Sequence, residues 1–315
     1  MENIENNAHQ TEEINIKEII LVILNKWKLV SSITFLFGVF SIFYALSLNN
    51  EYTSSAVLKA AKDPSSESGF TSSVGSLASL AGVSLGSSED DPRLFASTFL
   101  KSHQFLEHLL SFDGVLENIM AANSYDNVSK SIVYDPDLFD KNTNKWIRDI
   151  PSGRSLVPSA LEVQESRFSE DFYVNLDFQS GYITISYTHF SPVFAKEFLD
   201  LVIREINLIS KNKDLAESQS SLDYLYSKAA ENKVTSLDQT INELIKSELR
   251  KETYANARND YLLTPIDRPF LPEKKSAPSR ATLCMLITIL GFILSVIFVL
   301  FDNYIYSFKK KNKNL

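Results

Sequence analysis

The chain has 315 residues, with 31 lysines and arginines against 39 aspartates and glutamates, and its net charge is −8. This acidic balance lacks the basic footprint of a nucleic-acid-binding protein and excludes that class of partner. The only cysteine is Cys284, so no intramolecular disulfide can hold the chain together.

Two uncharged apolar segments, Leu29–Leu48 and Ala281–Phe301, bracket the chain. Each has the about 20 residues that an α-helix needs to cross a bilayer core, where only a helix satisfies the backbone of a lone segment. Positively charged flanks stay in the cytoplasm, so we expect both termini inside and the central region outside. The flanking lysines are Lys26 and Lys28 before the first span, and Lys309, Lys310, Lys311 and Lys313 after the second.

The segment after the first span begins with Tyr52–Leu58, which predicts a strand leaving the membrane. Asp63–Ser88 is rich in serine and glycine, which favours a loop at its start and a packed loop or weak helix after it. Asp91-Pro92 is typical of a helix start, because aspartate caps free amides and proline fits the first turn. The apolar spacing over Leu94–Met120 predicts a helix or helix pair with a break at Gly114.

The strongest strand signal lies in the middle of the chain. Residues 123–157 are polar and irregular, and no element is predicted there. Phe172–Phe178 and Ile183–Tyr187 then alternate between apolar and polar residues around a turn at Gln179–Gly181. Period-two apolarity with a glycine-containing turn predicts a β-hairpin with one buried face.

Ser191-Pro192 repeats the cap-and-proline start and opens a long helical pattern. No further proline occurs before Pro265, and apolar residues recur at steps of three and four. A single helix over Pro192–Tyr261 would extend about 100 Å and project from the domain, so its apolar stripe would need partner helices. A break near Asn232-Lys233 and two shorter packed helices are the alternative. The oligomer contacts that we predict on this stripe are Leu199, Ile206, Leu237, Ile241 and Leu244.

The approach to the second span is rich in proline. Its prolines impose an extended, semi-rigid path, whereas a flexible linker would use glycine and serine. We predict that this segment couples the domain to the span, and a spacer without mechanical consequence is the alternative. The predicted coupling residues are Pro265, Pro269, Pro272, Pro278 and Arg280, together with Gly291 in the span.

No catalytic, cofactor-binding or metal-binding motif stands out. His103 and His108 lack carboxylate or cysteine partners at ligand spacing, and the carboxylates are scattered. Neither a nucleophile elbow nor a phosphate-binding glycine loop is present in the sequence. We therefore predict a protein that is not an enzyme and uses no cofactor or metal.

Several stretches resemble the Wzz chain-length determinant family, the polysaccharide co-polymerases of bacterial inner membranes. The most specific is the proline-rich run Pro265–Arg280 leading into a span with Gly291. His103 stands where an arginine is usual, and relatives often have more small residues in the second span. The other matching stretches are Ile16–Ile20 with Lys26-Trp27-Lys28, Tyr52–Leu58, Leu100–Leu106, and Ser191–Ala195 with Glu205-Ile206-Asn207.

The resemblance implies a periplasmic α/β (α+β) domain with a long projecting helix, anchored by two transmembrane helices in a Gram-negative inner membrane. It also implies a homo-oligomeric ring of about eight subunits, which sets the modal length of lipopolysaccharide O antigen or a related glycan. The implied partners are the O-antigen polymerase, the lipid-linked polysaccharide and the membrane. The absence of a kinase domain resembles the lipopolysaccharide type of the family.

The predicted layout places an α/β base close to the membrane and a helical arm beyond it. In order, the segments are tail 1–28, span 29–48, base 49–190, arm 191–261, final strand and proline-rich segment 262–280, span 281–301 and tail 302–315. A membrane-tethered glycan-processing enzyme and a two-span periplasmic sensor are the competing functions. The short cytoplasmic tails leave no room for a signalling module, which weighs against the sensor.

Overall fold

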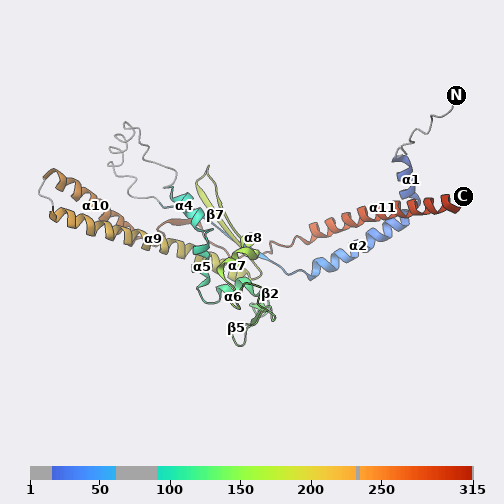
Figure 1. Cartoon of the computed structure of the whole chain (residues 1–315), viewed down its shortest axis with the longest axis horizontal. Helices are drawn as coiled ribbons and strands as arrows, with labels where there is room; N and C mark the ends of the chain where they lie inside the picture. The colour runs from blue at the N-terminus through green and yellow to red at the C-terminus, as the bar shows by residue number, and fades with distance from the viewer. Residues whose placement is uncertain (1–15, 62–90, 232–234, 314–315) are drawn as a thin grey trace, which may run out of the picture. The chain divides into compact units, whose positions relative to one another are not determined.

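The computed structural model describes residues 16–61, 91–231 and 235–313, and it divides into two compact units (Figure 1). The anchor unit comprises Met1–Asn49 and Ala277–Leu315, and the central unit comprises Asn50–Ser276. The serine- and glycine-rich segment Asp63–Ser88, expected as a loop or weak helix, lies outside the described residues.

Three helices form the anchor unit: α1 (Ile16–Asn25), α2 (Trp27–Ser47) and α11 (Arg280–Lys313). The segments Trp27–Ser47 and Arg280–Ile305 are long and apolar enough to cross a membrane, as the sequence predicted. Helix α1 was expected as part of a tail. Its run of isoleucine, leucine and valine before the bend at Lys26 forms a separate short helix instead.

A four-stranded sheet in the order β6-β7-β1-β8 forms the middle of the central unit, and its neighbouring strands are all antiparallel. The predicted first strand and hairpin are confirmed as β1 (Tyr52–Ala60), β6 (Phe172–Leu176) and β7 (Tyr182–His189). The hairpin turn needs Gly181, whose φ of 73° is in the left-handed region. The fourth strand, β8 (Leu263–Asp267), returns after the helices to pair with β1.

One face of this sheet is buried, and most residues on the other face are partly exposed. Residues alternate along β1 and β7, so that Ala56, Leu58, Ile183, Ile185 and Tyr187 enter the core. The first part of helix α9 (Pro192–Glu231) covers these side chains, because its apolar stripe matches the pleated surface. The opposite face carries mostly hydroxyl and small side chains.

Short helices complete the core. The N-cap at Asp91 is confirmed, since its carboxylate accepts a hydrogen bond from the Arg93 amide at 2.9 Å. The expected break at Gly114 is also present, and a second break at Ser102 divides the segment further. The helices here are α4 (Pro92–Phe99), α5 (His103–Leu110), α6 (Val115–Met120), α7 (Ala160–Val163), the π-turn Gln164–Phe168 and α8 (Ser169–Asp171).

Residues 123–157, where no element was predicted, contain two small hairpins. They are β2 (Ala122–Asp126) with β3 (Ser131–Tyr134), and β4 (Phe139–Asp140) with β5 (Lys145–Trp146). Their strands are too short for a periodic signal, and tertiary packing of Phe139 against Trp146 and Ala121 stabilises them.

The single helix over Pro192–Tyr261 that the sequence favoured is wrong, and the alternative of two packed helices is confirmed. Helix α9 spans 40 residues and α10 (Thr235–Ala257) spans 23. Leu222 of α9 packs against Ile241 and Ile245 of α10, so the two helices form an antiparallel hairpin. We call residues 211–231 and 235–257 the arm, and the sheet with residues 192–210 of α9 the base.

Candidate functional site

The proline-rich segment runs beside strand β1 within the central unit. Pro265 of β8 lies opposite Leu58, where the register shifts, and a proline is tolerated because this is an edge strand. Beyond β8, the Ser54 hydroxyl donates to the Phe270 carbonyl at 2.8 Å, and the Ser276 amide donates to the Glu51 carbonyl at 2.8 Å. The segment is therefore attached to β1 at two further points.

Two prolines of this segment are buried, and the two apolar side chains between them face outward. Pro269 and Pro272 are buried. Between them, Phe270 is 48% exposed and Leu271 is 52% exposed. Because prolines fix the backbone, they hold two large apolar side chains in contact with solvent next to the strand that follows the first span.

The remaining predicted coupling residues belong to the anchor unit. The Arg280 guanidinium donates to the Leu48 carbonyl at 3.2 Å, which joins the first residue of α11 to the C-cap of α2. Pro278 precedes α11. The structure thus divides the predicted set between the two units, and coupling across them stays a prediction.

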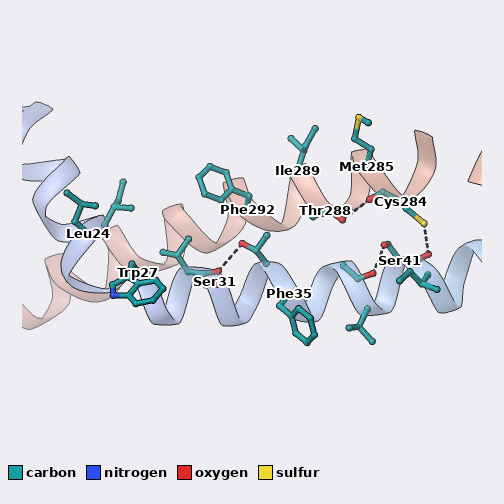
Figure 2. Close-up of a pocket in the computed structure, with 16 residues that line it drawn as sticks. Leu24, Trp27, Ser31, Phe35, Ser41, Cys284, Met285, Thr288, Ile289 and Phe292 are labelled. Carbon is teal, nitrogen blue, oxygen red and sulfur yellow. Dashed lines mark hydrogen bonds between the residues drawn. The ribbon is translucent and has the colours of Figure 1, made fainter. Parts of the chain in front are cut away.

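Helices α2 and α11 pack closely through small residues (Figure 2). A Cβ atom at Gly291 would overlap Phe37, so only glycine fits at this contact. Gly38 faces the Thr288 hydroxyl, and the Cys284 thiol donates to the Ser41 carbonyl at 3.6 Å. Small residues allow two membrane helices to approach, which gives Gly291 a physical role within one chain.

At the other end of α2 and α11, an ion pair joins the two helices. The Lys26 amino group lies 2.5 Å from the Asp302 carboxylate. Lys26 is also the bend between α1 and α2, where it interrupts the helix. The pair therefore fixes α11 against the start of the first span.

The predicted oligomer contacts occupy three different environments. Leu199 and Ile206 have no exposed surface and pack in the base, so for these two residues contact with the chain's own sheet replaces the expected contact with another subunit. Ile241 is buried inside the arm. Leu244 is 40% exposed and available to a partner. Leu237 lies in α10, and its side chain is outside the described set.

Asn207 has a role that the sequence analysis missed. Its side chain is buried in α9 and accepts hydrogen bonds at 2.8 Å from the Leu262 and Leu263 amides. Its amide group donates to the Leu263 and Ile203 carbonyls at 2.9 Å. Asn207 therefore fixes where the chain returning from the arm rejoins the sheet. A polar residue inside the apolar stripe of α9 was the available signal.

The three described histidines each have a partner. His103 pairs with Gln164, and the His108 imidazole lies 2.9 Å from the Glu205 carboxylate. His189 is buried, and burial lowers its pKa to about 4. Its ring accepts from the Ser191 amide and contacts the Asn118 carbonyl at 2.9 Å, an arrangement that needs the neutral tautomer protonated at Nε2.

Within residues 16–61, 91–231 and 235–313, no group of three or more histidine, cysteine, aspartate or glutamate side chains could hold a metal ion. The most buried ion pair joins Arg148 to Glu162, and its hydrogen bond lowers the pKa of the Glu162 carboxyl. Arg148 also donates to the Ser155 and Leu156 carbonyls, so this pair folds a loop.

The Wzz family, described as chain length determinant protein, matches residues 12–112. A full-length bacterial polysaccharide co-polymerase is similar at 12% identity, with a TM-score of 0.35 over 91% of this chain and 97% of that one. A fragment of WzzB, the polysaccharide co-polymerase from Salmonella Typhimurium, is similar at 12% identity, with a TM-score of 0.30 over 72% and 100%. No curated protein matches the chain.

The family match begins before α1 and ends after α5, so it includes the first span and the strand that follows it. The resemblance to the Wzz chain-length determinant family is therefore confirmed over residues 12–112.

Proposed function

We propose that this protein is a polysaccharide co-polymerase that sets the modal chain length of lipopolysaccharide O antigen or a related surface glycan. A separate polymerase makes the glycan, and this chain acts without catalysis as a homo-oligomeric ring in a bacterial inner membrane. Its central unit lies in the periplasm and both termini lie in the cytoplasm. The match of residues 12–112 to the chain length determinant family carries the proposal.

The architecture supports an assembly protein. Two apolar helices bracket a central unit, and the described residues bring together no metal-binding group. The arm has only a small internal cluster and leaves the predicted contact residue Leu244 40% exposed. A two-helix hairpin with an exposed leucine of this kind gains stability by packing against other helices. Copies of this chain are the partner that we propose.

Deletion of the gene, followed by a gel of the surface polysaccharide, tests the function. We expect polymer still to be made, with its preferred length lost and restored by the wild-type gene. Complete loss of polymer would contradict regulation of length, and an unchanged length distribution would contradict any role.

Oligomer formation through the arm is tested by Leu244→Lys. A charge on this exposed position should lower the subunit number that mass photometry measures in detergent, because a buried interface cannot solvate a lysine. Leu249→Lys is the matched control, because Leu249 is equally exposed on another face of the same helix. An unchanged subunit number for Leu244→Lys, with the arm folded by circular dichroism, would refute this interface.

Coupling through the proline-rich segment is tested by Pro272→Ala with Pro278→Ala. We expect an altered glycan length at normal expression, because alanine lets this path bend. Pro136→Ala is the control, since Pro136 lies exposed outside the segment. A wild-type length distribution from the double variant would make the segment a spacer.

A further inference from the structure

The anchor unit contains an apolar groove of about 900 Å³ on the side of α2 and α11 next to α1 (Figure 2). It extends along α2 from Trp27 to Ile42, and Met285, Ile289 and Phe292 of α11 form the other wall. At 1.5 Å per residue this is about 23 Å, which exceeds the about 15 Å depth of one leaflet. The groove is long enough for a whole acyl chain.

Three of the four hydroxyl side chains in the groove already donate to carbonyls of their own helices. The Thr34 hydroxyl donates to the Val30 carbonyl at 2.9 Å, and the Ser41 hydroxyl donates to the Gly38 carbonyl at 2.7 Å. The Thr288 hydroxyl donates to the Cys284 carbonyl at 2.7 Å. These three side chains have no spare proton for a polar ligand, so the groove favours an occupant without hydrogen-bonding groups.

A helix from another protein would fit this groove poorly, because the small residues that allow close helix packing are already used between α2 and α11. Gly38 already faces Thr288, and Gly291 already faces Phe37. Membrane helices approach closely through small residues or polar side chains. The two glycines of the spans are therefore used within the pair, and hydrocarbon remains as the filling.

Charge is concentrated at the Trp27 end of the groove. Lys28 is exposed and forms no ion pair among the described residues, whereas Lys26 is already paired with Asp302. Helix α11 continues beyond Asp302 and carries Lys309, Lys310 and Lys311 past this end. Basic residues beside a cleft between membrane helices attract anionic lipid headgroups.

We propose that this groove binds one anionic phospholipid, with an acyl chain between α2 and α11 and its phosphate beside Lys28. Trp27 marks the level of the interface, where an amphipathic ring is most stable. The site does not depend on a role in glycan assembly, because only residues of the anchor unit form it.

The chain supplies its own probe, because it has two tryptophans and only Trp27 lines the groove. The full chain with Trp146→Phe is reconstituted in phosphatidylcholine bilayers containing a minor fraction of brominated phosphatidylglycerol or brominated phosphatidylcholine. We expect Trp27 fluorescence to be quenched about fivefold more effectively by the anionic lipid, the preference that one lysine near an anionic headgroup supplies. Equal quenching by the two lipids would overturn the proposal.

Two variants and a matched control for each locate the site. Lys28→Gln should remove the preference for phosphatidylglycerol, while Lys101→Gln in the central unit should keep it. Ile289→Trp fills the groove with a larger side chain, and it is combined with Trp27→Phe. This double variant should retain less phosphatidylglycerol after purification, which native mass spectrometry measures. Ile297→Trp is its matched control, because Ile297 is similarly exposed on α11 but does not line the groove.

Two outcomes would assign the groove differently. Inorganic phosphate that abolishes the preference at constant ionic strength would show a phosphate site and not a lipid site. Ile289→Trp that lowers the subunit number and leaves lipid retention unchanged would show a contact between copies. Either result overturns the proposal, whereas loss of retention in Ile289→Trp alone supports it.

Discussion

Helix α9 passes through two regions that differ sharply in packing. In the base, Phe198, Leu199 and Val202 have almost no exposed surface, because they lie against the sheet. In the arm, the same helix buries only Ser218 and Leu222. The base has a core of its own, whereas the arm has one small cluster. The difference shows that the packing of α9 within the chain is concentrated in the base, whereas the association surface that we propose lies in the arm.

Aromatic packing makes the base rigid. The Phe198 ring lies 4.5 Å from the Tyr187 ring, between centroids, and also meets Phe168, Phe172 and Phe194. Edge-to-face and tilted aromatic pairs add to the area that they bury. A close-packed cluster of this kind deforms little, so it gives the first part of α9 a firm contact with the sheet.

The largest expected effect on stability comes from removing the Phe198 side chain at the centre of the base. Phe198→Ala should lower the free energy of unfolding by about 4 kcal/mol, through lost burial and a cavity. Thermal unfolding of the detergent-solubilised chain, followed by circular dichroism, measures the change. Leu208→Ala on the exposed side of α9 is the control, and an equal effect of the two variants would contradict the contrast between buried and exposed positions.

Asn207 tests the boundary between the two regions. Asn207→Ala leaves the Leu262 and Leu263 amides without their acceptor and should cost about 3 kcal/mol. Hydrogen exchange should show lost protection in β8 before α10. If α10 loses protection first, the Asn207 side chain stabilises the arm, and its contact with the start of β8 is not its main role.

The buried imidazole makes the base sensitive to acid. Burial lowers the pKa of His189 from 6.5 to about 4 in the folded chain, so the unfolded chain binds the proton more tightly. Stability from the neutral ring is fully present above pH 6.5 and is lost as the pH falls through 4, at about 3 kcal/mol in all. Unfolding midpoints between pH 7 and 4 measure this loss.

His189→Gln should flatten that pH dependence relative to the wild type, whatever its effect on stability at pH 7. His103→Gln is the control, because His103 is exposed and pairs with the uncharged Gln164. A slope unchanged in His189→Gln would assign the acid sensitivity to another group.

The smallest effect is expected in the arm. Ile245→Ala should weaken the seam with Leu222 by about 2 kcal/mol, because less surface is buried there. Hydrogen exchange should rise in α10 and the outer part of α9, while the sheet keeps its protection. Uniform loss of protection would mean that base and arm unfold as one unit, which would break the comparison.

Several elements could be predicted because their signals are local. The spans follow from length and lack of charge, and the β6–β7 hairpin follows from strict alternation around Gly181. The capping residues Asp91 and Ser191 also mark real helix starts, with Ser191 accepting from the Phe194 amide at 3.2 Å. Each of these rests on chemistry within a few residues.

Other features depended on contacts between distant residues. The periodicity of α9 and α10 is the same in one long helix and in a hairpin, so it could not distinguish the two. It also could not say that Leu199 and Ile206 face the sheet while Leu244 faces outward. The contact between Gly291 and Phe37 and the hydrogen bonds of Asn207 join positions far apart along the chain.

The amino-acid sequence by itself determined the two apolar spans, the main strands and the helical character of residues 192–231 and 235–257, because hydrophobicity and periodicity act over short distances. The tertiary structure decided that α9 and α10 pack against each other and which apolar residues become core. It also decided how the proline-rich segment attaches to β1. A local pattern specifies that a face must be buried, and only the packed chain specifies what buries it.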